Sequence, residues 1–443
     1  MGGHVPDRSR AAALACRRIV SCAILAALGL LACRGRTEPP PSPGEGAGQP
    51  GHSPSAEEAN PLDTYIDKAG GYLVFTQAED GSWPYFHSRT PDFANPEPHA
   101  NLFGTIVTLM NMTHTGFEAS SAFKRGADFV RGRMTEGYVW SLYEPGKFGA
   151  ESWLEPDADT TAVALTMLSG RLDVKPPQLK KLRTLFDRYR TADGLYRTYF
   201  DGFHGTKGFV LDRNVPSTGV NLNILGFFGN YEMPRASLVE GLRSAMQPDR
   251  YWEKTPFYHS LAVLACLASN AVEHGAPEAG ELQRKLLADF AAGPGKDPSF
   301  AENMPTLELA AYVKARSHAC LLDQSPCPDL DMNVFQLARR RKADGSWAAT
   351  PLYEYDINQQ ALEAFMQRRD FVIRRKRGGA AYDVERALAA PGTAHYYDGS
   401  PAETTSFALK ALVFYRELLN HRSAFMLQPG RSPGTPSPSA TPH

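Results

Sequence analysis

Seven segments of the chain carry Ala, Leu, Val and Ile at helical spacing. Each segment has Pro, Ser, Thr, Asp or Asn among its first residues. They begin near residues 98–101, 157–160, 216–219, 255–258, 304–307, 354–357 and 401–404. Side chains of these types open helices, because they satisfy or remove the free backbone N–H groups of the first turn. The pattern therefore predicts an apolar helix at each place.

Amphipathic stretches with charged faces lie between the apolar segments, as at residues 177–190 and 282–292. The helix starts recur every 40 to 60 residues or so, which leaves room for one helix and a returning partner. Strand-like alternation is scarce, which argues against a β or α/β fold. The chain is expected to be all-α, an α/α toroid of about six to seven helical hairpins with apolar inner and half-polar outer helices.

A short turn recurs in front of several apolar segments. Its versions are Asp-Gly-Ser-Trp at 80–83 and 344–347, Asp-Gly-Leu-Tyr at 193–196, and Tyr-Asp-Gly-Ser at 397–400. Asp-Gly supplies a tight corner with positive φ, and the aromatic residue beside it holds the corner in place. The turn is a weak internal repeat, as expected for stacked helical hairpins.

The first 33 residues have the layout of a secretory signal. A basic start that includes Arg17 and Arg18 precedes the apolar run 19–32, which is shorter than the roughly 20 residues of a membrane span. The run ends in Leu30-Leu31-Ala32-Cys33, which resembles a bacterial lipobox. The resemblance implies lipidation at Cys33 and a domain tethered to a membrane of the bacterial cell envelope, in the periplasm or at the outer surface.

Two segments lack residues that build a core. Residues 34–60 and 428–443 are rich in Pro, Gly, Ser and Thr, and we expect a disordered tether and a disordered tail. The toroid domain is then expected to span residues 61–427.

Composition narrows the functional classes. The net charge is -1 with 21% charged residues, so the basic excess of a nucleic-acid-binding surface is missing. Beyond the signal, the cysteines are Cys266, Cys320 and Cys327. In an oxidising compartment Cys320 and Cys327 are placed to close a short disulfide, and two free thiols remain an equal alternative.

Residues 77–83 read Gln-Ala-Glu-Asp-Gly-Ser-Trp, and 341–347 repeat this motif with Arg341 first. The motif matches the QW repeat of squalene and hopene cyclases, and with residues 156–162 it resembles the motifs of the terpenoid cyclase and protein prenyltransferase superfamily of α/α toroids. Residues 156–162, Pro-Asp-Ala-Asp-Thr-Thr-Ala, resemble the class II signature Asp-x-Asp-Asp-Thr-Ala and its bacterial Asp-x-Asp-Thr-Thr variant. The resemblance implies that the QW repeats are structural.

The resemblance also assigns catalytic roles. It makes Asp159 the general acid that protonates an alkene or epoxide, and Asp157 the residue that holds it by hydrogen bonding. Thr160 stands where the strict motif has Asp, which removes a charge that normally tunes the acid. A carboxyl at the start of an inner helix suits this task, because the helix N-terminus stabilises the anion left after proton transfer. The purely structural interpretation is an N-cap, since Asp and Thr are favoured there for local reasons.

The other inner-helix starts bring further polar and aromatic side chains to one rim of the ring. The residues expected to bind substrate are Trp153, Thr160, His99, Asn221, Tyr258, His259, Glu308, Asp356 and Glu403, with Asn101, Asn223, Asn358 and Gln359 nearby. An aromatic lining that steadies carbocations is expected from Phe103, Trp153, Phe227, Phe228, Phe257, Tyr258 and Tyr355.

Three functions remain open at this stage. The first is a class II-type cyclase that acts on an isoprenoid or similar lipid. The second is a glycan-processing hydrolase or lyase, with a carboxylate pair drawn from Asp159, Asp356, Glu308 and Glu403. The third is a lipoprotein that binds a ligand without catalysis. Phosphate-binding loops and zinc or magnesium motifs are missing from the sequence, so no cofactor and no metal are expected.

Overall fold

The computed structural model describes residues 60–90, 92–99, 101–143, 155–203, 214–247, 257–258, 260–358 and 393–426. The side chains of 353–358, 393–396 and 424–426 lie outside this description.

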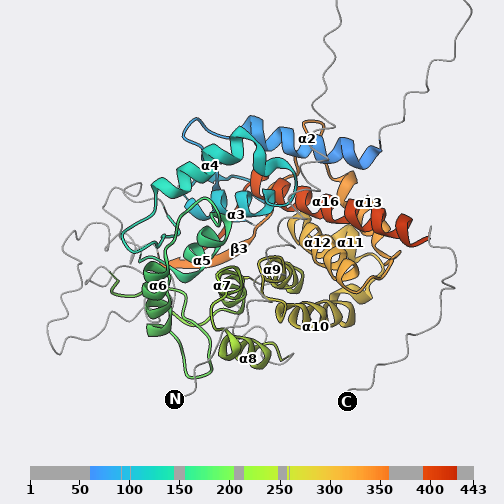
Figure 1. The fold of residues 1–443 in the computed structure, drawn as a ribbon. Coiled ribbons are helices and arrows are strands. Elements are labelled where there is room, and N and C mark those ends of the chain that lie inside the picture. The colour runs from blue at the N-terminus through green and yellow to red at the C-terminus, as the bar shows by residue number, and fades with distance from the viewer. Residues whose placement is uncertain are drawn as a thin grey trace, which may run out of the picture. The chain divides into compact units, whose positions relative to one another are not determined.

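Six helices of the described residues form a closed inner ring (Figure 1). They are α3 (Leu102–Met112), α5 (Ala158–Met167), α7 (Thr218–Asn230), α9 (Leu261–Glu273), α12 (Thr306–Leu322) and α16 (Pro401–Met426). Each helix contacts the next in this order, and α16 contacts α3. Most residues of the inner helices are buried, as in α7, where all but the last residue are buried. The predicted α/α toroid is confirmed.

Amphipathic helices form the outer layer. They are α2 (Pro61–Thr76), α4 (Ser121–Gly132), α6 (Pro176–Arg188), α8 (Ala236–Ala245), α10 (Ala279–Ala292) and α13 (Leu330–Arg339), with the short α11 (Phe300–Asn303), η1 (Phe117–Ala119) and η3 (Pro294–Lys296). Each outer helix buries one stripe and leaves the other in water; α6, for example, buries Leu182, Leu185 and Phe186. This division follows the hydrophobic pattern of the sequence.

A small antiparallel sheet adds strands to the helical ring. Its order is β2 (Glu97–Pro98), β1 (Phe86–Ser88), β4 (Thr393–Gly399) and β3 (Tyr353–Asn358). The expectation of a helix that starts near 354–357 was wrong at these residues. They belong to β3, which pairs along its whole length with β4. Tyr353, Tyr355 and Ile357 alternate along β3, and such aromatic and β-branched residues favour a strand over a helix.

Three tryptophans each join one outer helix to the inner helix that follows it. The indole Nε1 atoms of Trp83, Trp140 and Trp347 donate at 2.8 Å to a backbone oxygen ten residues earlier, at the end of α2, α4 and α13. Their backbone N–H groups donate at 3.1 Å to threonine hydroxyls of α3, α5 and α16. These tryptophans thus have a structural role. The contact made by Trp140 was missed because the residues before it lack the Asp-Gly-Ser sequence.

The Asp-Gly corners pack against the next outer helix. Gly81, Gly194 and Gly345 adopt φ of 94°, 88° and 92°, as expected for such corners. Gly399 does not show this positive φ, because it lies in β4 and pairs with Phe86 of β1. The corner at Gly345 follows α13 and lies against Lys68 of α2, so this contact closes the outer layer between the last and first hairpins.

Replacing Gly345 with alanine should weaken this closure. A Cβ at Gly345 would lie 2.4 Å from the backbone oxygen of Lys68, in addition to the strain of its positive φ. We expect Gly345→Ala to lower the free energy of unfolding by about 2 kcal/mol or more, measured by denaturant titration. Gly71→Ala is the control: its Cβ meets nothing within 4 Å, and alanine favours the helix. Equal stability of wild type and Gly345→Ala would contradict the packing.

Cys320 and Cys327 form a disulfide, which settles the alternative left open by the sequence. Cys266 is a free, buried cysteine. Among the helices of the described residues, none is both long and apolar enough to cross a membrane.

Candidate active site at the rim of the ring

Asp157 caps the inner helix α5. Its backbone is extended, and its Oδ1 accepts a hydrogen bond of 2.6 Å from the backbone N–H of Thr160. The other carboxyl oxygen is buried without a hydrogen-bond partner among the described residues. The motif resemblance had implied that Asp157 bonds to the Asp159 carboxyl. Asp157 instead binds the backbone of its own helix. Thr160 is fully buried beside it, and its hydroxyl also lacks a partner there.

Asp159 lies in the first turn of α5, but its carboxyl does not fold back onto the helix. Asn223 of α7 donates to Oδ1 at 2.7 Å, and the hydroxyl of Tyr258 donates to Oδ2 at 2.5 Å. The side chain is 9% exposed. The two aspartates of the motif thus have different environments, in which Asp157 caps the helix and Asp159 is held by residues from other elements.

The surroundings of Asp159 favour a carboxyl that can hold and release a proton. Burial raises its pKa to about 6, and the bonds from Tyr258 and Asn223 oppose this rise by stabilising the anion. Burial also raises the pKa of Tyr258 well above 10, helped by the Asp159 charge, so its hydroxyl stays a donor. A carboxyl with a pKa near 6 and two donors aimed at its anion has the properties of a general acid.

The substitution Asp157→Asn should keep the helix cap and remove the ionisable carboxyl of Asp157. Burial raises the pKa of Asp157 to about 8 against the bond from Thr160. Because this folded pKa exceeds the unfolded value, stability is full below about pH 4 and is lost as pH rises through 8. Asparagine caps equally well and stays neutral, so the variant should be more stable than wild type at pH 9 by over about 1 kcal/mol.

The measurement is denaturant unfolding at pH 5 and pH 9. The exposed residue Asp173 provides the control Asp173→Asn, which should behave like wild type at both values. A variant Asp157→Asn that loses stability at pH 9 would show that Asp157 is ionised in the folded protein.

A second buried carboxyl lies at the start of α16. Glu403 is fully buried, and the Tyr85 hydroxyl donates to its two oxygens at 3.4 and 3.3 Å. Burial raises its pKa well above the usual range, against the Tyr85 bond and with help from Asp398. Asp398 is itself buried and accepts a bond of 3.2 Å from Asn101, the cap of α3.

Three other predicted residues have local partners. His99 lies with its Nδ1 at 3.0 Å from Nδ1 of His87, and burial together with His87 lowers its pKa to about 3. Glu308 accepts a bond of 2.6 Å from the Ser260 hydroxyl. Asn221 is fully buried, and its amide bonds to the backbone of Tyr196 and of Ser217, so it holds the 193–196 turn.

Several predicted residues fall outside the described part of the chain. These are Trp153, His259, Gln359 and the lipidation site Cys33. The backbone of Asp356 and Asn358 is described as part of β3, but their side chains, like that of Tyr355, are not.

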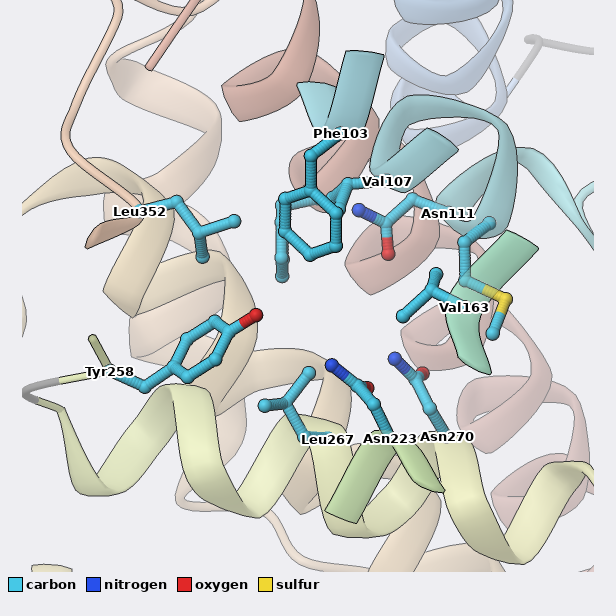
Figure 2. A pocket seen from close by; sticks show the side chains of 11 residues that line it. Phe103, Val107, Asn111, Val163, Asn223, Tyr258, Leu267, Asn270 and Leu352 are labelled. Atoms are coloured by element: carbon cyan, nitrogen blue, oxygen red, sulfur yellow. The ribbon is translucent and has the colours of Figure 1, made fainter. Parts of the chain in front are cut away.

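A narrow cavity lies inside the ring next to Asp159. Its lining comes from α3, α5, α7, α9 and α16 and from two residues of loops, Tyr258 and Leu352. The lining residues are Phe103, Val107, Met110, Asn111, Val163, Asn223, Tyr258, Leu267, Asn270, Leu352 and Phe407 (Figure 2). Asn223 and Tyr258, the two partners of Asp159, both belong to this lining. About 20 Å³ is open to the centre of a water molecule, which is room for about one or two waters.

The aromatic lining differs in part from the expectation. Phe103 and Tyr258 line the cavity as predicted, and Phe407 of α16 joins them. Phe227 and Phe228 instead pack between the layers, where their ring centroids lie 5.5 and 5.7 Å from that of Phe186. A helix that is apolar on all sides does not show in its sequence which aromatics face the hollow.

Sequence reasoning missed a buried charged cluster deeper in the ring. Lys314 of α12 and Lys410 of α16 both form ion pairs with Glu273 of α9, the second at 3.0 Å. Lys314 also donates to the Ser269 hydroxyl at 2.6 Å and to Oδ1 of Asn270 at 2.8 Å. The cluster therefore fixes Asn270, which lines the cavity. The described residues contain no group of three or more His, Cys, Asp or Glu side chains placed to bind a metal ion.

Comparison with known proteins supports the fold. No protein-family model matches the chain, and no curated protein matches it. Among solved structures, the type II terpene cyclase MstE from Scytonema matches with a TM-score of 0.51 at 15% identity, over 81% of this chain and 99% of that one. A variant of that cyclase in complex with its substrate, geranylgeranyl dihydroxybenzoate, matches with a TM-score of 0.52 at 15% identity, over 81% and 97%. A possible GH105 family member from Salmonella enterica also matches, with a TM-score of 0.43 at 13% identity, over 84% and 96%.

Proposed function

We propose that this protein is a class II-type cyclase that protonates an isoprenoid or similar lipid, with Asp159 as the general acid. The observation that carries the proposal is the environment of Asp159. Its carboxyl is buried, has a pKa raised to about 6 and is held by two donors that line the cavity. Because Asp157 supplies the helix cap, Asp159 is left available for proton transfer.

The proposed reaction begins with transfer of the Asp159 proton to an alkene carbon. Bonds from Tyr258 and Asn223 stabilise the carboxylate that remains. The carbocation then closes a ring beside Phe103, Phe407 and Tyr258, whose π faces attract positive charge. Loss of a proton from the ring-closed cation to solvent forms the product, and a proton from solvent restores Asp159, so substrate and product have the same mass. Since the cavity is narrow, the residues that line it have to move apart when a prenyl chain enters.

The structural neighbours are consistent with this proposal. The cyclase MstE, whose substrate complex carries a geranylgeranyl group, shares the ring architecture. At 15% identity this likeness concerns the fold, so the chemistry proposed here depends on Asp159 and its partners.

The test is an activity screen of the full chain, purified in detergent, against polyprenyl lipids and polysaccharides. We expect a cyclic product of unchanged mass from a polyprenyl lipid, detected by mass spectrometry and NMR. The rate should rise as pH falls through about 6, because the protonated form of Asp159 is the active one. Cleavage of a polysaccharide would replace this function with the glycan-processing one, and binding without conversion would favour a ligand-binding protein.

We further propose that the protein is exported and anchored by a lipid on Cys33. The disulfide between Cys320 and Cys327 supports export, because such bonds persist in oxidising compartments. A lipid anchor would keep the domain beside the bilayer that supplies its substrate. Cys33→Ala is expected to move the protein from the membrane fraction to the soluble fraction, and an unchanged membrane fraction would contradict the lipid anchor.

A further inference from the structure

Two amide groups face the deep end of the cavity with unused hydrogen-bonding capacity. Asn111 of α3 donates its Nδ2 to the Ser406 hydroxyl at 3.2 Å, and Asn270 of α9 accepts at its Oδ1 from Lys314 at 2.8 Å. Figure 2 shows the oxygen of Asn111 and the nitrogen of Asn270 turned toward the hollow. Neither of these two atoms has a hydrogen-bond partner among the described residues.

The pair lies far from the acid along the ring axis. The inner helices start at the same rim, and Asp159 is the second residue of α5, whereas Asn111 and Asn270 are the tenth residues of α3 and α9. At 1.5 Å per residue, eight residues separate the two levels by about 12 Å. The apolar side chains of Val107, Val163 and Leu267 lie along the cavity with them. The cavity thus has Tyr258 and Asn223, the two partners of the acid, in its lining and a donor beside an acceptor at its deep end.

The charges behind Asn270 do not create an anion site. The ammonium group of Lys314 has three N–H bonds, and they are used by Glu273, Ser269 and Asn270. Lys410 pairs with the same Glu273 and lies near the backbone oxygen of Met110. An anionic head group would therefore meet amides rather than a free cation, and would lose its hydration without compensation.

From these contacts we infer that the deep end of the cavity binds a neutral hydroxyl, so the substrate is an isoprenoid alcohol rather than a diphosphate or a hydrocarbon. This inference rests on the proposed cyclase function. A hydroxyl both donates and accepts, so it donates to Oδ1 of Asn111 and accepts from Nδ2 of Asn270. A hydrocarbon would leave both amide atoms buried and unpaired, which costs binding free energy.

The test is a binding measurement with the full chain carrying Asp159→Asn, so that no probe is converted. The probes are geranylgeraniol, its diphosphate and the matching hydrocarbon, and their Kd values are measured by calorimetry in detergent. We expect the alcohol to bind about 10- to 100-fold more tightly than the hydrocarbon, and the diphosphate more weakly than the alcohol. Equal or tighter binding of the diphosphate or the hydrocarbon would overturn the inference.

Two variants localise the effect. Asn111→Leu removes the acceptor and keeps the size of the side chain. Asn270→Asp keeps the oxygen that Lys314 needs but replaces the donor N–H groups with an acceptor. Each removes one of the two bonds to the hydroxyl, so each should lower the ratio of hydrocarbon to alcohol Kd by about 3- to 10-fold. Asn333→Leu, in a buried position of the outer helix α13, is the control and should leave the ratio unchanged. If Asn111→Leu and Asn270→Asp keep the wild-type ratio of Kd values, the hydroxyl does not bind to these two residues.

The outcomes separate the inference from the proposed function. Selective binding of the alcohol by the Asp159→Asn chain, with no cyclisation by wild type, would retain the hydroxyl site and reject the cyclase. Cyclisation by wild type without selectivity for the alcohol would do the reverse.

Discussion

Asp159→Asn is expected to reduce the cyclisation rate by about 100- to 10,000-fold while the protein stays folded. Asparagine has the size of aspartate but carries no acidic proton. Its oxygen still accepts from Tyr258, and the Asn223 amide has only to turn over to face its nitrogen. The rate is measured with the substrate found in the activity screen, and folding by circular dichroism and denaturant unfolding.

Asp157→Asn is the matched control for this prediction. It should keep activity within about 10-fold of wild type, because asparagine caps the helix as aspartate does. The two substitutions should also change the pH dependence of stability over different pH ranges, because the pKa values of the two aspartates differ. Burial raises the pKa of Asp159 to about 6, so its contribution to stability is lost as pH rises from about 4 through 6. Asp159→Asn should remove this loss. Equal activity of the two variants would contradict the division of roles between the aspartates.

Glu273→Gln is expected to lower the free energy of unfolding by about 3 to 5 kcal/mol, because it leaves two buried ammonium groups without their counter-ion. Burial alone would raise the pKa of Glu273, but Lys314 and Lys410 outweigh it and hold that pKa well below its usual range. Burial lowers the pKa of Lys314 as well, so the variant should recover part of its stability at high pH. Denaturant unfolding at pH 7 and pH 10 measures both effects.

Two controls separate burial from charge in this experiment. Glu281 forms an exposed ion pair with Arg243, so Glu281→Gln should cost no more than about 1 kcal/mol. Replacing Glu273, Lys314 and Lys410 together with methionine removes all three charges, and it should restore most of the stability. A triple variant as unstable as Glu273→Gln would show that the unpaired lysines are not the cause.

The sequence predicted the ring and its rim because both depend on local signals. Caps such as Asn101 and Asp157 mark where the inner helices begin, and the Asp-Gly corners at Gly81 and Gly345 mark the returns. Such signals place Asp159 at the rim without any tertiary information. They did not distinguish a cap from an acid, because that depends on Asn223 and Tyr258, which come from elsewhere in the chain.

The side-chain contacts inside the ring could not be predicted from the sequence. Asn111 and Asn270 lie near the C-terminal ends of apolar helices, and the same pattern would result if they faced a neighbouring helix instead of the cavity. Lys314 and Lys410 are similar, since their common partner Glu273 belongs to a third helix. The misassigned element β3 forms its hydrogen bonds with β4, which is separated from it by 34 residues of the chain. Long-range partners of this kind decide side-chain roles that local spacing does not encode.

The proton transfer from Asp159 is tested most directly by running the reaction in D2O. A carboxyl that exchanges with solvent between turnovers delivers one deuteron to the alkene carbon, and carbon-bound deuterium does not wash out. The account predicts a product with one deuterium at the protonated carbon from wild type, and no such product from Asp159→Asn. A wild-type product without deuterium at that carbon, or a labelled product formed at the normal rate by Asp159→Asn, would contradict it.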